Sequence, residues 1–224
     1  QKLDNKIFDI IKSYKPDLVI VMAYGLLIPS NFLDIPFYGF INVHLSLLPR
    51  WRGASPIEYA LQNGDSKSGV SIIKMEEKLD AGPIITQKEI TINQNINKDN
   101  LLKLINDEGI KLLINILPKL FLDDVILKKQ NEKKITYAYK IHSEDRKINF
   151  KNTPSKIINK IRAFSIKPGA WFLYNSERIK IISAIKKNNE GKPGTILNKY
   201  FELGCLNGSI LPTLLQREGK NIVK

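Results

Sequence analysis

Residues 18–24 read LVIVMAY, an uninterrupted apolar run that ends at Gly25. Such a run is typical of a strand that is buried on both faces of a parallel sheet. A second, shorter strand is predicted at residues 39–44, which read GFINVH. Because helical patterns alternate with these strands, the sequence predicts an α/β domain of the doubly wound, Rossmann-like class.

The segments around these two strands continue the alternation. Apolar residues at helical spacing predict a helix over residues 4–14, and Ser-Pro followed by Glu predicts another that begins at Ser55. Strands are expected at residues 70–74 and 84–92. A long helix is expected to follow, with Asp99 as its N-cap.

The last third of the chain has a different pattern. Residues 125–142 are rich in lysine and are predicted to link an α/β domain at 1–124 to a second domain at 143–224. After one helix opened by Thr153, this second domain holds short strands separated by turn residues. The expected strands are 170–174, 179–184, 194–197 and 201–206. We therefore expect a small β-barrel of the OB-like kind.

The net charge of +13 is unevenly distributed along the 224 residues. Residues 1–130 carry 16 basic and 15 acidic side chains, whereas residues 131–224 carry 19 basic and 7 acidic ones. A bias of composition alone would affect both parts equally. A neutral part joined to a strongly basic part indicates that the second part binds a polyanion.

Composition also excludes several classes of protein. A hydrophobic content of 43% argues against disorder, and no apolar run approaches the roughly 20 residues of a membrane-spanning helix. The single cysteine, Cys205, cannot form an internal disulfide, which fits a reducing compartment such as the cytoplasm. Zinc sites built on several thiolates are excluded too, and no other cluster predicts a metal.

The sequence Asn42-Val43-His44 lies at the end of the second predicted strand. Residues two apart on a strand face the same side, so Asn42 and His44 are expected to project together. Open α/β sheets bind their ligands at this carboxyl end. An amide beside an imidazole can stabilise an oxyanion and move a proton. The alternative is a purely structural histidine, which so short a motif leaves open.

Two loops add further candidates. The first holds Ser46, Leu47, Leu48 and Pro49, whose apolar side chains and free backbone groups suit a flat heterocycle. The second, LDAG at residues 79–82, places Asp80 where a carboxylate can orient an imidazole and stabilise its cation. The alternatives are a loop that packs on the core and an aspartate that forms a turn.

Together these segments resemble the signatures of the formyltransferases that use 10-formyltetrahydrofolate. In that family an Asn, a His and an Asp form the catalytic set, which implies this role for Asn42, His44 and Asp80. The SLLP loop lies at the folate site, which implies that Ser46–Pro49 bind the co-substrate. Later segments resemble the linker and carboxy-terminal domain of the methionyl-tRNA formyltransferases. These segments are TYA with Lys140, SED at 143–145, IRAF at 161–164 and PGTI at 193–196.

The resemblance implies formyl transfer from 10-formyltetrahydrofolate to the amino group of methionine on initiator tRNA, for translation initiation. It implies a monomeric cytoplasmic enzyme that needs no metal and no membrane. Lys140 and Arg162 are the candidates for phosphate contacts, together with Lys156 and Lys160. Three aromatic residues could stack on bases, although such residues are more often core. They are Tyr137, Tyr139 and Trp171.

The chain also departs from the family pattern. Further βα units, a glycine-containing turn and a basic loop precede the part that resembles Gln1 onward, and the family continues past Lys224. Leu45 stands where a smaller residue is expected. We therefore expect an enzyme that lacks its amino-terminal portion. Two other functions stay open: a formyltransferase for a small amine, such as an amino sugar nucleotide or glycinamide ribonucleotide, and a nucleic-acid-binding module with an inactive α/β half.

Overall fold

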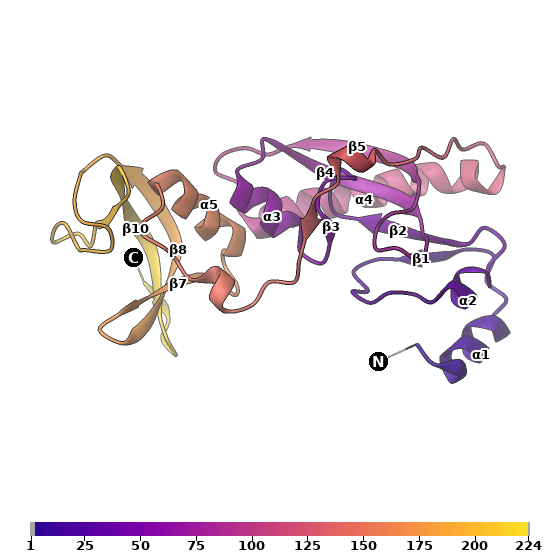
Figure 1. Cartoon of the computed structure of the whole chain (residues 1–224), viewed down its shortest axis with the longest axis horizontal. Coiled ribbons are helices and arrows are strands. Elements are labelled where there is room, and N and C mark those ends of the chain that lie inside the picture. The colour runs from indigo at the N-terminus through magenta and orange to yellow at the C-terminus, as the bar shows by residue number, and fades with distance from the viewer. Residues whose placement is uncertain (1–2, 224) are drawn as a thin grey trace. The chain divides into compact units, whose positions relative to one another are not determined.

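The computed structural model describes residues 3–223, which form two compact units (Figure 1). The first unit comprises the chain up to Pro56, residues 67–91 and residues 102–140. The second comprises residues 57–66, 92–101 and the chain from Ile141 onward. The units thus interleave in sequence, and the domain boundaries expected at 124 and 142 stay a prediction.

The first unit is built on a four-stranded sheet of order β1-β2-β4-β5. Its strands are β1 (Val19–Val21), β2 (Phe40–His44), β4 (Lys67–Lys74) and β5 (Ile84–Thr91). β1 and β2 run parallel, whereas β4 is antiparallel to both β2 and β5. The sheet is therefore mixed. β4 and β5 pair in the antiparallel direction because the short connection between them has no room for the crossover that parallel strands need.

The prediction that the first strand is buried on both faces is wrong for the residues that the structure describes. β1 is an edge strand of only three residues, and the side chain of Ile20 is 44% exposed. Its neighbour in the ladder, Ile41 of β2, is fully buried. The face of β1 that carries Ile20 is thus left open by the described residues, whereas the adjoining part of β2 is covered.

Helices of the first unit are placed by caps and by close packing. Asp4 caps α1 (Asn5–Ser13) through a bond from the Ile7 amide, 3.0 Å long. The short α2 (Ser30–Leu33) follows β1. α4 (Lys98–Phe121) lies against the sheet at Gly109, where an added Cβ would come within 3.5 Å of Val70 and Val43. Glycine thus permits close approach of this helix to β2 and β4.

The cap of α4 differs from the predicted one. Asn97 accepts the Asn100 amide at 2.9 Å, whereas Asp99 accepts the Ile166 amide at 3.1 Å. Asp99 is already inside the helix, so its carboxylate is available for a partner far along the chain. Of α3 (Pro56–Asn63), only Pro56 belongs to the first unit, and residues 57–63 belong to the second.

The second unit packs one helix on an antiparallel sheet. Its elements are α5 (Pro154–Phe164), β7 (Ala170–Tyr174), β8 (Glu177–Lys187), β9 (Leu203–Cys205), β10 (Gly208–Arg217) and β11 (Ile222–Val223). The order is β11-β10-β8-β7, with β9 also paired to β10. In the described residues β7 and β11 do not pair with each other, and β7 carries only a bridge between Trp171 and Lys147 on its outer side, so the expected closed barrel is not confirmed. β10 has no counterpart among the predicted strands.

The core of this unit explains why helix and sheet adhere. Apolar side chains on one face of α5 interlock with those of the sheet, and the largest are almost fully buried. They include Ile157, Ile161 and Phe164 of the helix and Phe172, Ile181 and Ile210 of the strands. Thr153 caps the helix, as predicted, and Pro154 occupies its first position. Within residues 3–223, no helix combines the length and apolar character needed to cross a bilayer.

Candidate active site

Asn42 and His44 lie at the carboxyl end of β2, beside the end of the parallel strand β1. Their side chains project from the same face of the strand, as the spacing predicts. Side-chain exposure of His44 is only 6%. The prediction that these two side chains meet at one edge of the sheet is confirmed.

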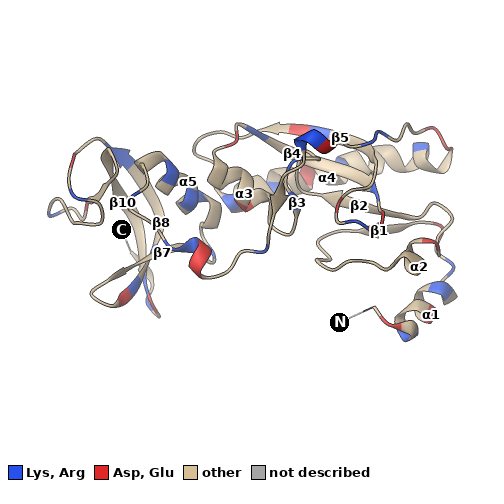
Figure 2. Cartoon of the chain, viewed as in Figure 1, with Lys and Arg blue, Asp and Glu red and all other residues tan. Residues whose placement is uncertain are grey.

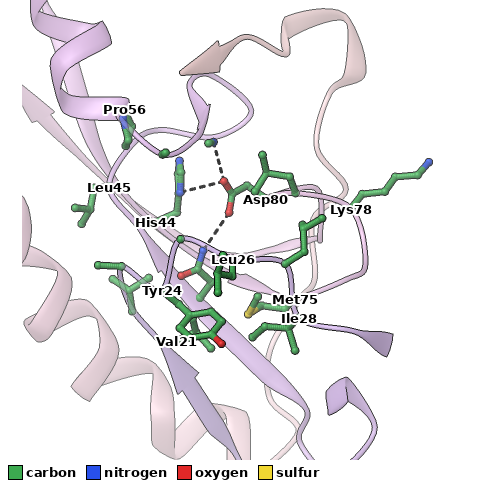
Figure 3. A pocket seen from close by; sticks show the side chains of 18 of the residues that line it. Val21, Tyr24, Leu26, Ile28, His44, Leu45, Pro56, Met75, Lys78 and Asp80 are labelled. Atoms are coloured by element: carbon green, nitrogen blue, oxygen red, sulfur yellow. Dashed lines mark hydrogen bonds and ion pairs between the residues drawn. The ribbon is translucent and has the colours of Figure 1, made fainter. Parts of the chain in front are cut away.

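Asp80 joins them from the loop between β4 and β5 (Figure 3). Its Oδ1 accepts from Nδ2 of Asn42 at 3.1 Å, and its Oδ2 accepts from the Gly53 amide at 2.8 Å. The same Oδ2 lies 3.5 Å from Nδ1 of His44. The structure therefore brings the three predicted catalytic side chains into one hydrogen-bonded cluster.

The loop that carries Asp80 is held by its own backbone geometry. Asp80 has a φ of 47°, and any Cβ at Gly82 would collide with the carbonyl oxygen of Lys74. Glycine is therefore required at position 82 for the loop to lie close against the end of β4. This close approach aims the Asp80 carboxylate at β2.

Gln130, which lies in the predicted linker, holds the same loop through hydrogen bonds. Its Nε2 donates to the carbonyls of Asp80 and Gly82 at 2.7 and 2.8 Å. Its Oε1 accepts from Nε and Nη2 of Arg52 at 3.1 and 2.8 Å. No pattern in the lysine-rich sequence around Gln130 indicated this role, because it depends on a contact 50 residues away in the chain.

The imidazole of His44 lies between two oxygen acceptors. Nε2 is 2.9 Å from the carbonyl oxygen of Trp51, and Nδ1 faces Asp80. An imidazole satisfies both acceptors only when it carries two protons. The arrangement thus suits a group that gains a proton and stabilises nearby negative charge.

A cavity of about 320 Å³ opens beside this cluster (Figure 3). Asn42, His44 and Asp80 contribute to its polar wall, together with Glu76 and Lys78. The apolar wall comes mainly from the loop after β1 and includes Tyr24, Leu26, Leu27, Ile28 and Met75. A concave site with an apolar wall and a few convergent polar groups suits a flat, partly polar ligand.

Residues 23–28 were missed as site residues by the reasoning from sequence. They directly follow β1, and ligands of open α/β sheets bind at the carboxyl ends of parallel strands. Gly25 has a φ of 72°, which lets the loop turn back toward the cavity. The available signal was thus their place after the strand, which the sequence did show.

Family comparisons agree with this geometry. The model described as "Formyl transferase" matches residues 1–117, and the one described as "Formyl transferase, C-terminal domain" matches residues 140–224. The chain belongs to the formyl transferase family.

Individual relatives of this formyl transferase support the same conclusion. The methionyl-tRNA formyltransferase of Ehrlichia canis is 41% identical over 215 residues, which cover 94% of this chain and 69% of the relative. The methionyl-tRNA formyltransferase from Clostridium thermocellum superposes with a TM-score of 0.65 at 21% identity, covering 84% of this chain and 81% of that one.

A solved structure of another kind has a similar fold. HypX from Aquifex aeolicus, in complex with tetrahydrofolic acid, superposes with a TM-score of 0.74. It is 19% identical and covers 96% of this chain, while this chain spans only 38% of HypX. At such identity the likeness shows the fold of this formyl transferase and nothing further.

The SLLP loop has a different place from the three catalytic candidates. None of Ser46, Leu47, Leu48 and Pro49 is among the residues that line the cavity. Ser71 donates to the Ser46 carbonyl at 2.6 Å and accepts the Leu48 amide at 3.0 Å. The Leu48 side chain packs in a buried cluster with Ile73 and Ile84. The loop thus packs on β4 and β5, and its contact with folate stays a prediction.

Lys140 and Arg162 differ in how available their charges are. Lys140 is exposed. Arg162 is half-buried, and its guanidinium donates to the carbonyls of Asn93 and Gln94 and to the side chain of Asn159. Burial lowers the pKa of Arg162. Contact of either residue with tRNA stays a prediction, and for Arg162 the carbonyl bonds favour a role in holding α5.

The described residues contain no group of three or more His, Cys, Asp or Glu side chains placed to hold a metal ion. The cluster at the cavity offers one imidazole and one carboxylate, both already engaged with protein groups.

Proposed function

We propose that this formyl transferase moves the formyl group of 10-formyltetrahydrofolate to the amino group of methionine on initiator tRNA. The observation that carries the proposal is the convergence of Asn42, His44 and Asp80 on one cavity. The chain that contains them is 41% identical to a methionyl-tRNA formyltransferase.

The reaction requires a nucleophile, an oxyanion site and a path for a proton. The methionine nitrogen attacks the formyl carbon, and the carbonyl oxygen becomes an oxyanion. Nδ2 of Asn42 carries two hydrogens, of which Asp80 takes one, so the other can be donated to this oxyanion. The tetrahedral intermediate then expels N10 of the folate.

His44 and Asp80 divide the handling of charge and proton between them. The attacking nitrogen must lose a proton, and the departing folate nitrogen must gain one. A water positioned by Asp80 carries this proton, while His44 stabilises the oxyanion and Asp80 holds the ring. We place the pteridine of the folate against the apolar wall of the cavity, with Ser46–Pro49 supporting the strand end behind it.

The basic residues of the second unit supply affinity for the tRNA body. Residues 141–224 contain many more Lys and Arg than Asp and Glu, and these charges spread over α5 and the sheet (Figure 2). Phosphate contacts of this kind give sequence-independent affinity that falls steeply with salt. Lys140, the last residue of the first unit, directly precedes this region and is exposed.

The test is a formylation assay on the complete protein that contains this chain. With 10-formyltetrahydrofolate as donor, methionyl-initiator tRNA should be formylated, whereas an amino sugar nucleotide or glycinamide ribonucleotide should not. Preference for either small amine would overturn the proposal in favour of a small-amine formyltransferase. Binding of tRNA with no formylation of any acceptor would instead show an inactive nucleic-acid-binding module.

A further inference from the structure

Two tyrosines near the end of the first unit remain outside the core. Tyr137 and Tyr139 are 44% and 67% exposed, while Ala138 between them is fully buried. Their rings lie almost parallel, with centroids 6.0 Å apart and an interplanar angle of 19°. Tyrosine is enriched at interfaces, because its ring offers an apolar face while its hydroxyl stays in water.

Trp171 shows by contrast what a structural aromatic looks like in this chain. It is only 3% exposed, and its Nε1 donates to the carbonyl of Ser143 at 3.0 Å. Of the three aromatic residues that the sequence offered as base-stacking candidates, the structure therefore leaves two available. Both lie on the same short segment.

That segment is tied directly to the catalytic cluster. β6 (Tyr137–Ala138) pairs in parallel with β3 (Arg52–Gly53), and the Ser55 amide donates to the Ala138 carbonyl at 3.2 Å. The Gly53 amide in turn donates to Asp80 at 2.8 Å. The segment with the two tyrosines thus pairs with β3, and the Gly53 amide of β3 binds the carboxylate of Asp80.

The charge of the segment is also one-sided. Residues 128–140 hold five lysines and one glutamate, and all five lysines are exposed. The lysines are Lys128, Lys129, Lys133, Lys134 and Lys140. Exposed aromatic rings within a basic strip are the combination by which proteins bind single-stranded nucleic acid, with bases on the rings and phosphates on the cations.

We propose that Tyr137 and Tyr139 form a stacking platform for unpaired nucleotides at the aminoacylated 3′ end of the tRNA. The inference rests on the proposed function, because that function requires an amino acid esterified to a single-stranded end to reach Asn42 and His44. Bases just behind the terminal nucleotide must then lie close to the site. The tyrosine pair would hold them there and limit the positions that the methionine amine can occupy.

The experiment compares leucine and phenylalanine at both positions in the complete protein. Tyr137→Leu and Tyr139→Leu remove the flat ring, whereas Tyr137→Phe and Tyr139→Phe keep it. Each leucine variant should raise KM for methionyl-tRNA by about 10-fold, since stacking on a protein ring contributes substantially for each base. The phenylalanine variants should stay near wild type, and KM for 10-formyltetrahydrofolate should not change. Tyr14→Leu, at another exposed tyrosine of the same unit, is the matched control and should leave both KM values unchanged.

A direct readout uses tRNA with 2-aminopurine at an unpaired 3′ position. Binding to the wild-type protein should quench its fluorescence, and the double leucine variant should abolish the quenching. An active wild-type enzyme with an unchanged KM for tRNA in the leucine variants would overturn the inference alone. So would leucine variants that change only the melting temperature or the KM for folate. A wild-type protein that formylates no tRNA would instead refute the proposed function.

Discussion

Two carboxylates, Asp80 in the first unit and Glu202 in the second, are each surrounded by several hydrogen-bond donors. Glu202 is 4% exposed and accepts from the hydroxyl of Ser209 and from the side-chain amides of Asn189 and Asn198. The Ser209 bond, aided by both amides and by the charge of Lys187 and opposed by burial, holds the pKa of Glu202 below its ordinary value. All of its direct hydrogen-bond partners are neutral.

Asp80 has neutral donors too, yet its surroundings differ in two respects. It faces the titratable ring of His44, and it lines a cavity that can admit a substrate. Glu202 lines no part of that cavity. A buried, well-bonded carboxylate therefore does not by itself indicate catalysis. A titratable neighbour and adjoining open space do.

Asp80→Asn should show the largest difference in function between Asp80 and Glu202. It removes the carboxylate charge beside the His44 ring, so we expect a loss in kcat of at least about 100-fold. The measurement is the initial rate of formyl-methionyl-tRNA formation.

Asn42→Ala should lose about 100-fold to 1000-fold in kcat, because the oxyanion donor is missing. Near-normal turnover in both variants would refute the catalytic assignment.

Glu202→Gln is the matched change in the second unit and should affect stability. The new amide places donors against the donors of Asn189, Asn198 and Ser209, which should cost about 2 kcal/mol of unfolding free energy. Urea unfolding measures this loss. Turnover per folded molecule should remain at the wild-type level, and a selective fall in kcat would contradict the structural role.

The pH dependence of stability sharpens this comparison. Because the pKa of Glu202 is lowered in the folded state, ionised Glu202 stabilises the fold at pH values above its ordinary pKa of 4.5. This contribution is lost as pH falls through the lower folded pKa. The difference in unfolding free energy between wild type and Glu202→Gln should therefore shrink on acidification below about pH 4.5. A constant difference across that range would contradict it.

Gln130→Ala tests whether the Asp80 loop needs the hydrogen bonds from Gln130 to hold its position. Loss of the bonds to the carbonyls of Asp80 and Gly82 should let the carboxylate shift, which lowers kcat by about 10-fold to 100-fold. Single-turnover rates with saturating substrates isolate this effect from binding. An unchanged rate would show that Gly82 and the ends of the strands alone fix the loop.

Lys140→Ala should give the smallest effect. If Lys140 contacts a phosphate, the slope of log affinity for tRNA against log salt should decrease by about one. Lys12→Ala, at a lysine of α1, serves as the control and should leave the slope unchanged. Equal slopes for wild type and Lys140→Ala would remove Lys140 from the interface.

Much of the site could be predicted because it depends on local periodicity. Asn42 and His44 share a face because residues two apart on any strand do so, whatever the fold around them. Thr153 and Pro154 mark a helix start for a similarly local reason. Asp80 was a candidate from its own loop, and the resemblance to formyltransferases, which joined it to Asn42 and His44, depended on motifs within single segments.

Other features could not be predicted, because they depend on contacts between distant segments. Gln130 holds the Asp80 loop across 50 residues of chain, and the sequence around it suggests only a linker. The order of the second sheet depends on which strands pair, and β10 was missed although it pairs with β8, β9 and β11. Arg162 looked like a surface cation until its carbonyl partners were known.

The sequence by itself determined which chemical groups this formyl transferase possesses and in which part of the chain its positive charge lies. Those properties follow from composition and from short repeats along one strand or helix. Only the tertiary structure decided that Asp80 faces His44, that the SLLP loop packs on β4 and β5, and that Tyr137 and Tyr139 remain exposed while Trp171 does not. Burial and long-range hydrogen bonding belong to the packed chain as a whole, and no local stretch of sequence contains them.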